Sequence, residues 1–279
     1  MLRSIARGAP PSDTDPRPVA QGFRSYANQT FAIVAAEVQR IRHDPVELLP
    51  RAVQPVLWLT LFGGVMARIR GISPDNVPYL DFLAVGILAQ SALSVAILYG
   101  MTAIWDHDFG TLQRYLVSPT PRSALVIGKA LSAAVRGLAQ ALIVYILALV
   151  LGVGIVLNPL NVLGVGVVVV LGAALFSTFS LIVACTVKTR ERFMGVAQVL
   201  IMPIFFASNA IYPLSLMPAW LSTVSRMNPL TYQVDALRML MLPNAPSEYG
   251  LWLDVGALMI VTAVLTCIAA RVYGRLGFR

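Results

Sequence analysis

Charged residues are scarce in this sequence: they make up 12% of its 279 residues, whereas soluble domains carry about 25%. Hydrophobic residues account for 57% of the chain. A soluble core of this length could not bury so much apolar surface, which excludes an ordinary soluble domain. Because backbone polar groups inside a bilayer must be satisfied within the protein, the composition predicts an all-α membrane protein.

Cysteine and histidine are also rare. Cys185 and Cys267 both lie within apolar runs, and two cysteines are too few for a disulfide framework or a zinc site. His43 and His107 are isolated from each other and belong to no metal-binding or catalytic pattern. The sequence therefore predicts no metal site, no catalytic residue and no cofactor on this chain.

A nucleotide-binding loop is missing too. Gly128-Lys129 is the one Gly-Lys pair, and Ser123 stands where a phosphate-binding loop requires glycine. Arg136, Asp81 and Asp254 fall near the predicted ends of apolar spans, where charged side chains can reach the membrane surface. These patterns favour neither ATP hydrolysis on this chain nor an ion-coupled carrier.

The chain divides into a tail and one membrane domain. Residues 1–22 are polar and rich in proline, which predicts a disordered cytoplasmic tail. Within residues 23–279, uncharged apolar stretches of roughly 20 residues predict six transmembrane helices. The expected spans are about 48–69, 80–104, 123–156, 162–187, 193–213 and 251–272. Residues 157–161, which contain a proline and two asparagines, are predicted to form a turn between the third and fourth spans.

The basic residues are distributed unevenly across the predicted membrane. With six spans, 17 lysines and arginines fall on the side of both termini and 4 fall on the other. Cytoplasmic segments carry the excess of positive charge, so both termini are expected in the cytoplasm. The net charge of +8 is spread between apolar runs and not gathered in one patch, which argues against nucleic acid as a partner.

Residues 23–44 predict a helix that lies in the membrane interface. Apolar residues recur there at the spacing of one helical face, at Phe31, Val34, Val38 and Ile41, and polar residues fall elsewhere. The alternative is an N-terminal extension of the first span, although Pro45 favours a break.

The segment between the fifth and sixth predicted spans is largely apolar but broken by proline, at Pro213, Pro218, Pro229 and Pro243. It is too interrupted for one span and too apolar for a solvated loop. Short helices in the outer leaflet are expected, because they satisfy their own backbone groups while burying apolar faces.

Residues 105–123, WDHDFGTLQRYLVSPTPRS, interrupt the apolar chain with a charged element. Asp106 and Asp108 begin it, and the dipole of a helix favours acids at its N-terminal end. Phe109 and Leu112 share an apolar face, whereas Arg114 lies on another. The pattern predicts a short cytoplasmic helix at 105–120 that can seat in a groove of another protein. A solvated turn would explain the charges but not the apolar face.

This element resembles the acidic-Gly-Thr-Leu-x-Arg-x-Leu-x-Ser-Pro motif of type-2 permeases of ATP-binding cassette (ABC) exporters. Drug-resistance (daunorubicin-type) and polysaccharide-export permeases belong to that family. A second match follows the fifth span, at Ile201, Ile204, Ala207, Ser208, Ala210, Met217-Pro218, Pro229, Leu230, Tyr232 and Arg238. The resemblance covers nearly the whole chain. It departs at Asp106 and Asp108, where many relatives have glutamate, and this change keeps the charge.

The resemblance implies a permease subunit of an ATP-driven exporter in the plasma (inner) membrane of a bacterium. Two permeases, identical or paired with a sister chain, would form the pathway, and a separate ATPase subunit would bind ATP and Mg. The ATPase would contact Asp106, Asp108, Phe109, Gly110, Thr111, Leu112 and Arg114. The exported substrate would be amphiphilic: a drug, as in antibiotic resistance, a lipid or a lipid-linked glycan. The alternatives are a membrane assembly scaffold and an ion-coupled carrier without an ATPase.

Small and polar residues in the second and fifth spans predict a surface for close helix contact. Gln90 and Ser91 lie in the second span, and Ser208 and Asn209 lie in the fifth. Such side chains favour helix association in lipid, so these four are expected to line the pathway at the interface of two permeases. The alternative, hydrogen bonding within one subunit, is equally open.

Overall fold

The computed structural model describes residues 49–68, 77–108, 122–187, 189–243 and 247–273, and four residues nearer the N-terminus. Within these residues the protein is helical and contains no strand, which confirms the all-α class. Four described helices are long and apolar enough to cross a membrane. They are α4 (Tyr79–Tyr99), α7 (Arg122–Val150), α8 (Pro159–Val187) and α12 (Leu251–Tyr273).

The other two predicted spans correspond to shorter or interrupted helices. The stretch predicted at 48–69 consists of α2 (Leu49–Leu57), the π-helical segment η2 (Trp58–Gly63) and α3 (Gly64–Met66). The stretch predicted at 193–213 contains α9 (Arg190–Phe206), which has Pro203 in its last turn. Six crossings therefore stay a prediction, and four are supported by continuous helices.

The N-terminal predictions fall mostly outside the described residues. The structure describes four positions of the predicted interfacial helix, Ala35, Val38, Gln39 and His43, and all four are helical. The tail at 1–22 lies outside the described residues, as do residues 109–121 of the predicted cytoplasmic helix.

The connection between α7 and α8 differs from the predicted turn. α7 ends at Val150, and the chain then passes through Gly152, whose φ of 78° suits glycine. α8 begins at Pro159, inside the stretch predicted as the turn. Proline is well tolerated in the first turn of a helix, and the Asn158 side chain caps this one by accepting a hydrogen bond from the Leu160 amide at 3.1 Å.

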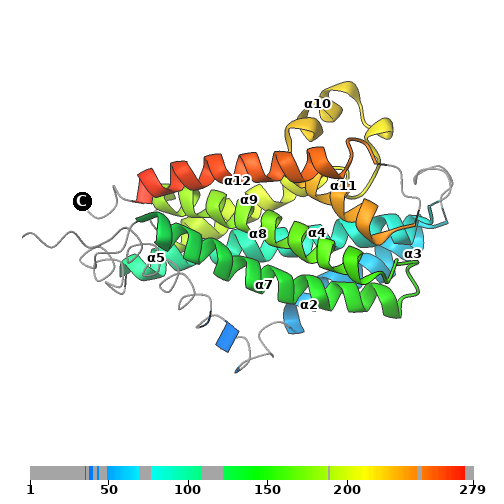
Figure 1. The fold of residues 1–279 in the computed structure, drawn as a ribbon, viewed down its shortest axis with the longest axis horizontal. Helices are drawn as coiled ribbons and strands as arrows, with labels where there is room; N and C mark the ends of the chain where they lie inside the picture. The colour runs from blue at the N-terminus through cyan, green and yellow to red at the C-terminus, as the bar shows by residue number, and fades with distance from the viewer. Residues whose placement is uncertain are drawn as a thin grey trace, which may run out of the picture.

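The long helices lie side by side along the long axis of the molecule (Figure 1). α5 (Met101–Asp108) and the C-terminal end of α12 lie at one end of the bundle, and α3 and α10 (Ala219–Met227) lie toward the other. The segment between α9 and α12 contains the 3-10 turn η3 (Leu214–Leu216), α10 and α11 (Pro229–Met241). Short helices were expected in this segment, and their depth in a membrane stays a prediction.

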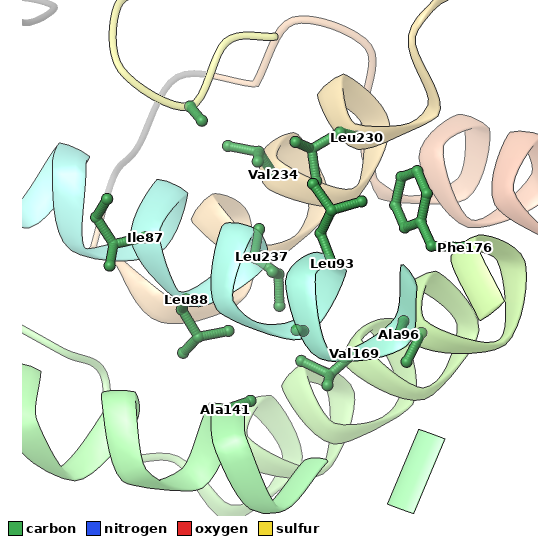
Figure 2. Packing of buried hydrophobic residues seen from close by; sticks show 14 of the residues in the cluster. Ile87, Leu88, Leu93, Ala96, Ala141, Val169, Phe176, Leu230, Val234 and Leu237 are labelled. Atoms are coloured by element: carbon green, nitrogen blue, oxygen red, sulfur yellow. The ribbon is translucent and has the colours of Figure 1, made fainter. Parts of the chain in front are cut away.

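Helix α4 is the centre of the bundle. It packs against α7, α8, α9 and α11, and most of its side chains are buried. Figure 2 shows Ile87, Leu88 and Leu93 of α4 among side chains from α7, α8 and α11. Neighbouring helices enclose α4 on several sides. Accordingly, apolar residues occur on every side of α4, and its few polar residues form no polar face.

Close backbone contact fixes α4 against the loop that follows α9. A Cβ atom at Gly86 would lie 2.8 Å from the carbonyl carbon of Ala210 and closer still to its oxygen. Real Cβ atoms do not approach backbone atoms so closely, so only glycine allows the loop to lie against the helix here.

Gly86→Ala should therefore destabilise the folded protein by about 1–3 kcal/mol, because the added methyl group displaces backbone and not a flexible side chain. Thermal denaturation of the purified chain in detergent measures the change. Gly195→Ala on α9 is the matched control, since nothing lies within 4 Å of a Cβ there. That change should be neutral or stabilise by up to about 1 kcal/mol. Equal denaturation temperatures for the two variants would contradict the contact.

Candidate functional site

Helix α5 carries the beginning of the element predicted to contact an ATPase. Asp106 and Asp108 belong to α5, which starts at Met101 and not at 105. The two acids therefore stand at the far end of this helix, so the expectation that they occupy a helix N-terminus is wrong. Five residues of the predicted contact set lie outside the described residues: Phe109, Gly110, Thr111, Leu112 and Arg114.

The position of α5 is set where α4 ends. Gly100 separates the two helices, and a Cβ there would lie 2.8 Å from the Cβ of Ser180 on α8. The Ser180 hydroxyl donates a hydrogen bond to the carbonyl oxygen of Ile97 in the last turn of α4. α5 also packs against α8 and α9. A displacement of α5 would therefore act directly on the central helix and on α8.

Basic side chains surround this junction. Lys129 on α7 donates from Nζ to the Thr102 hydroxyl at 3.2 Å. The guanidinium of Arg190 on α9 lies 6.0 Å from the ring centroid of Trp105. Cations over an aromatic face are attracted by about 0.5–1 kcal/mol at exposed sites. α5, which bears the two aspartates, is thus held among positive charges from α7 and α9.

Arg136 is a third cation at this junction, and its position differs from the predicted one. Its guanidinium lies 5.6 Å from the ring centroid of Tyr99, and the residue is only 7% exposed. The expectation that Arg136 extends to the membrane surface is wrong, because the side chain is buried against α4.

Two small cavities lie beside α4, one at the α5 junction and one at the predicted pathway residues Gln90 and Ser91. The first, of about 180 Å³, is lined in part by Arg51, Arg136, Thr102 and Trp105. The second, of about 150 Å³, shares Arg51 with the first and is also lined by polar side chains, namely Gln54, Gln90, Ser91, Ser94 and Gln140. Sites for drug-sized ligands usually enclose about 300–1,000 Å³, so neither cavity within one subunit is large enough to hold such a substrate.

A proline in α2 accounts for one polar contact in the second cavity. Pro55 has no N–H, so it cannot bond the carbonyl oxygen of Arg51 four residues earlier. The Gln140 side chain on α7 donates to that oxygen instead, at 3.4 Å. The contact ties α2 to α7.

The four predicted pathway residues are all buried inside a single chain, with exposures of 3% for Gln90, 4% for Ser91, 0% for Ser208 and 1% for Asn209. The Ser91 hydroxyl donates to the Ile87 carbonyl at 2.7 Å, and Gln90 donates to the Ser94 hydroxyl at 3.3 Å. The structure brings Gln90 and Ser91 together on α4 and places Ser208 and Asn209 in the loop after α9. These contacts favour hydrogen bonding within one subunit, and a place at a subunit interface stays a prediction.

Asn228 links α9 to α11 and was not singled out by the sequence. Its Nδ2 donates to the carbonyl oxygens of Ile204 at 2.7 Å and Ala207 at 3.0 Å, where the end of α9 leaves carbonyl groups without helical donors. Its Oδ1 accepts from the Leu230 amide at 3.0 Å and caps α11. One side chain thus satisfies groups at the end of one helix and the start of another.

Arg238 is a buried cation between α11 and α4. Its guanidinium lies 3.8 Å from the ring centroid of Phe82, and its Nη2 donates to the Asn209 carbonyl oxygen at 2.9 Å. Burial lowers the pKa of Arg238 to about 10, while the charges of Asp235 and Glu248 oppose that shift. Arg238 therefore stays protonated at neutral pH and holds the loop after α9 against the centre of the bundle.

Two acids toward the end of the bundle away from α5 lie in different surroundings. Asp81 is half-buried, and its Oδ2 accepts a hydrogen bond from the Gly154 amide at 3.2 Å. Asp254 on α12 is completely buried, so the expectation that it reaches the membrane surface is wrong. Asp235 and Arg238 stand three residues apart on α11, so they share one face of that helix. This spacing was the signal in the sequence for the buried charged group near Asp254.

Among the described residues, no group of three or more His, Cys, Asp and Glu side chains is arranged to hold a metal ion.

Comparisons with known proteins identify the family of this chain. The family model described as ABC-2 type transporter matches residues 28–242. Transport permease ycf38 of Cyanophora paradoxa is 31% identical over 221 residues, which cover 77% of this chain and 74% of the relative. YbhR of Escherichia coli K12, named a multidrug ABC transporter permease, is 27% identical over 214 residues, or 74% of this chain and 56% of YbhR. YadH of the same strain, named an inner membrane transport permease, is 24% identical over 212 residues. These residues cover 74% of this chain and 80% of YadH.

Asn228→Ala should destabilise the protein by about 2–4 kcal/mol, because it removes the α11 cap and leaves two carbonyl oxygens at the end of α9 without their donor. Asn158→Ala is the matched control: that asparagine caps α8 at an exposed position and makes one such bond. The control should cost about 1 kcal/mol. Thermal denaturation of both variants in the same detergent makes the comparison, and an equal loss for both would show that the link to α9 is not stabilising.

Proposed function

Because the chain belongs to the ABC-2 type transporter family, we propose that it is the membrane-embedded half of an ATP-driven exporter. It is a multi-pass membrane protein and a permease subunit of an ABC transporter, as its family and its relatives named permeases support. The single observation that carries the finer proposal is α5, a short helix with two aspartates at one end of the bundle, joined to the central helix through Gly100.

ATP would be hydrolysed on a separate chain. The sequence offers no phosphate-binding loop, and membership of an ABC permease family implies an ABC ATPase as partner. That partner would hold ATP and Mg and would dock on α5 and the residues after it. The proposed contact set is the one given by the sequence motif: Asp106, Asp108, Phe109, Gly110, Thr111, Leu112 and Arg114.

The packing of α5 supports a mechanical role. When ATP draws two ATPase subunits together, each would push the α5 element of one permease. Ser180 and Gly100 connect α5 to α8 and α4, so the push would reach the helix that contacts most of the bundle. Such rigid-body movement between two conformations is the usual form of alternating access. The direction of transport in this proposal is outward.

The substrate in this proposal is amphiphilic, such as a drug, a lipid or a lipid-linked glycan. Support comes from the relative YbhR, which is named a multidrug ABC transporter permease. The two cavities beside α4, of about 180 and 150 Å³, are too small for such a molecule. In this proposal the pathway forms between two permeases, either two copies of this chain or this chain and a sister chain.

Charge reversal at the proposed contact tests ATPase docking. Asp108→Lys combined with Arg114→Glu should leave membrane insertion intact and lower co-purification of the ATPase by roughly tenfold or more, since losing a paired interfacial charge costs about 2–5 kcal/mol. Substrate-stimulated ATP hydrolysis by the complex should be abolished. Arg271→Glu, at an exposed position in the last turn of α12, is the control and should leave both readouts unchanged. Normal ATPase binding by the double variant would refute the proposed contact, and failure to insert would show that the element is structural.

Reporter fusions test the orientation. A reporter fused after Arg279 should be active on the cytoplasmic side, and one inserted between Val150 and Pro159 should be active on the outer side, since the cation distribution is 17 to 4. The loop between α7 and α8 is short and exposed in part, so it accepts an insertion better than a helix would. Two reporters active on the same side would overturn the six-span topology.

A further inference from the structure

A pair of buried carboxyl groups joins α11 to α12. Asp235 and Asp254 are both completely buried, and their side chains are close enough to interact. Ionised carboxyl oxygens only accept hydrogen bonds, so a hydrogen bond between the two groups requires a proton. Two like charges so close together also repel strongly away from water.

The hydrogen-bond donors around the pair all bond one atom, Oδ2 of Asp235. Oδ2 of Asp235 accepts three hydrogen bonds, from the Ser247 hydroxyl at 2.9 Å, the Glu248 amide at 3.0 Å and the Tyr249 amide at 3.2 Å. These three donors all bond Oδ2, which leaves Oδ1 as the oxygen of Asp235 that can accept a further hydrogen bond. Neither oxygen of Asp254 receives a hydrogen bond from a protein donor, and the same holds for Oδ1 of Asp235. The atoms left over are those that a shared proton would join.

The summed charge of Arg238, Asp235 and Asp254 also favours one proton on the carboxyl pair. Arg238 lies one helical turn after Asp235, is 3% exposed, and its charge interacts with Asp235. With one proton on the carboxyl pair, Arg238 and the pair sum to zero. With none, the buried group would carry a net negative charge, which is costly in an apolar interior.

We propose that Asp235 and Asp254 form a proton-binding site that holds a single proton at neutral pH, carried by Asp254 and donated to Oδ1 of Asp235. The site fastens the last membrane helix to α11 and to the loop at 247–250. A bound metal cation is the competing occupant, and the carboxyl–carboxyl contact argues against it, because a cation between them would separate the two groups.

Few other charged or titratable groups face the pair. Arg238 and Tyr232 come from α11, Glu248 and Tyr249 come from the loop, and Arg226 of α10 acts on Tyr249. α8, which packs against both α11 and α12, has no charged residue along its length. α7 and α4 also pack nearby; the outer half of α7 is uncharged, and Asp81 of α4 is bonded to Gly154. Arg238 is thus the one cation from these helices that is buried beside the pair.

The pH dependence of stability has a definite sign. At neutral pH the folded chain would bind one more proton at this pair than the unfolded chain, where a free aspartate titrates near pH 3.9. Stability therefore falls as pH rises above about 4, until the folded pair also releases its proton. In an exporter, the pair would make the outer end of α12 more firmly attached in acid than in alkali.

Infrared spectroscopy of the full chain in lipid nanodiscs tests the proposal. The wild type at neutral pH should show the C=O stretching band of about one protonated carboxyl per chain, and isotope-labelled aspartate should shift it. Asp254→Asn should abolish the band and keep the fold, because an asparagine amide can donate to Asp235 as the acid does. Asp235→Asn should shift the band, because Asp254 would then donate to an amide in place of a carboxylate. Asp81→Asn, the matched control, should leave the band unchanged.

Thermal denaturation between about pH 5 and pH 9 gives the second readout. The midpoint of the wild type should fall across this range more steeply than that of Asp254→Asn, and Asp81→Asn should follow the wild type. Absence of the acid band in the wild type would overturn the proposal whether or not the variants fold. So would an unshifted band in Asp235→Asn, which would mean that Asp254 does not donate to Asp235. A rise in the midpoint on adding Na⁺ or Ca²⁺, without an acid band, would assign the site to a cation.

Discussion

A bilayer supplies no hydrogen-bond partners, so each polar group that this chain buries has to be satisfied by another part of the chain. The constraint explains several contacts that otherwise seem unrelated. Gln140 donates to the carbonyl oxygen that Pro55 leaves free, and Asn228 donates to two carbonyl oxygens where α9 ends. Arg238 donates to the loop after α9 and covers an aromatic ring of α4. Each contact joins one helix to another part of the bundle. The hydrogen bonds that satisfy buried polar groups therefore also hold the helices together.

Much of the architecture could be predicted from the sequence, because long apolar stretches leave a membrane helix as the main possibility. α4, α8 and α12 begin and end near their predicted positions. The errors have local causes. Pro159 suggested a turn, yet proline also starts helices, and only the asparagine before it distinguishes the two cases. Asp254 was expected at the membrane surface because it stands near the end of a span, and the sequence could not show that α11 covers that end.

The candidate site also has one part that the sequence could predict and one part that it could not. The motif beginning at Asp106 is visible in the sequence, since charged residues in an apolar chain stand out. The sequence could not show that α5 starts at Met101, because the close contact between Gly100 and Ser180 of α8 joins residues eighty positions apart. The pathway residues illustrate a different limit. Small and polar side chains promote helix contact, but composition does not distinguish a contact within one chain from a contact between two.

The burial of Asp254 against α11 also constrains the order in which the protein is made. α12 is translated after the other described helices, and an aspartate in a membrane helix lowers the tendency of that helix to insert by itself. Asp235, Arg238 and the loop at 247–250 are translated earlier, so their polar surroundings can already be present when Asp254 enters the membrane. α12 would then insert as a docking step onto a formed bundle. A chain that ends before Leu251 would leave the α11 carboxylate without its partner, which is the kind of defect that cellular quality control detects in membrane proteins.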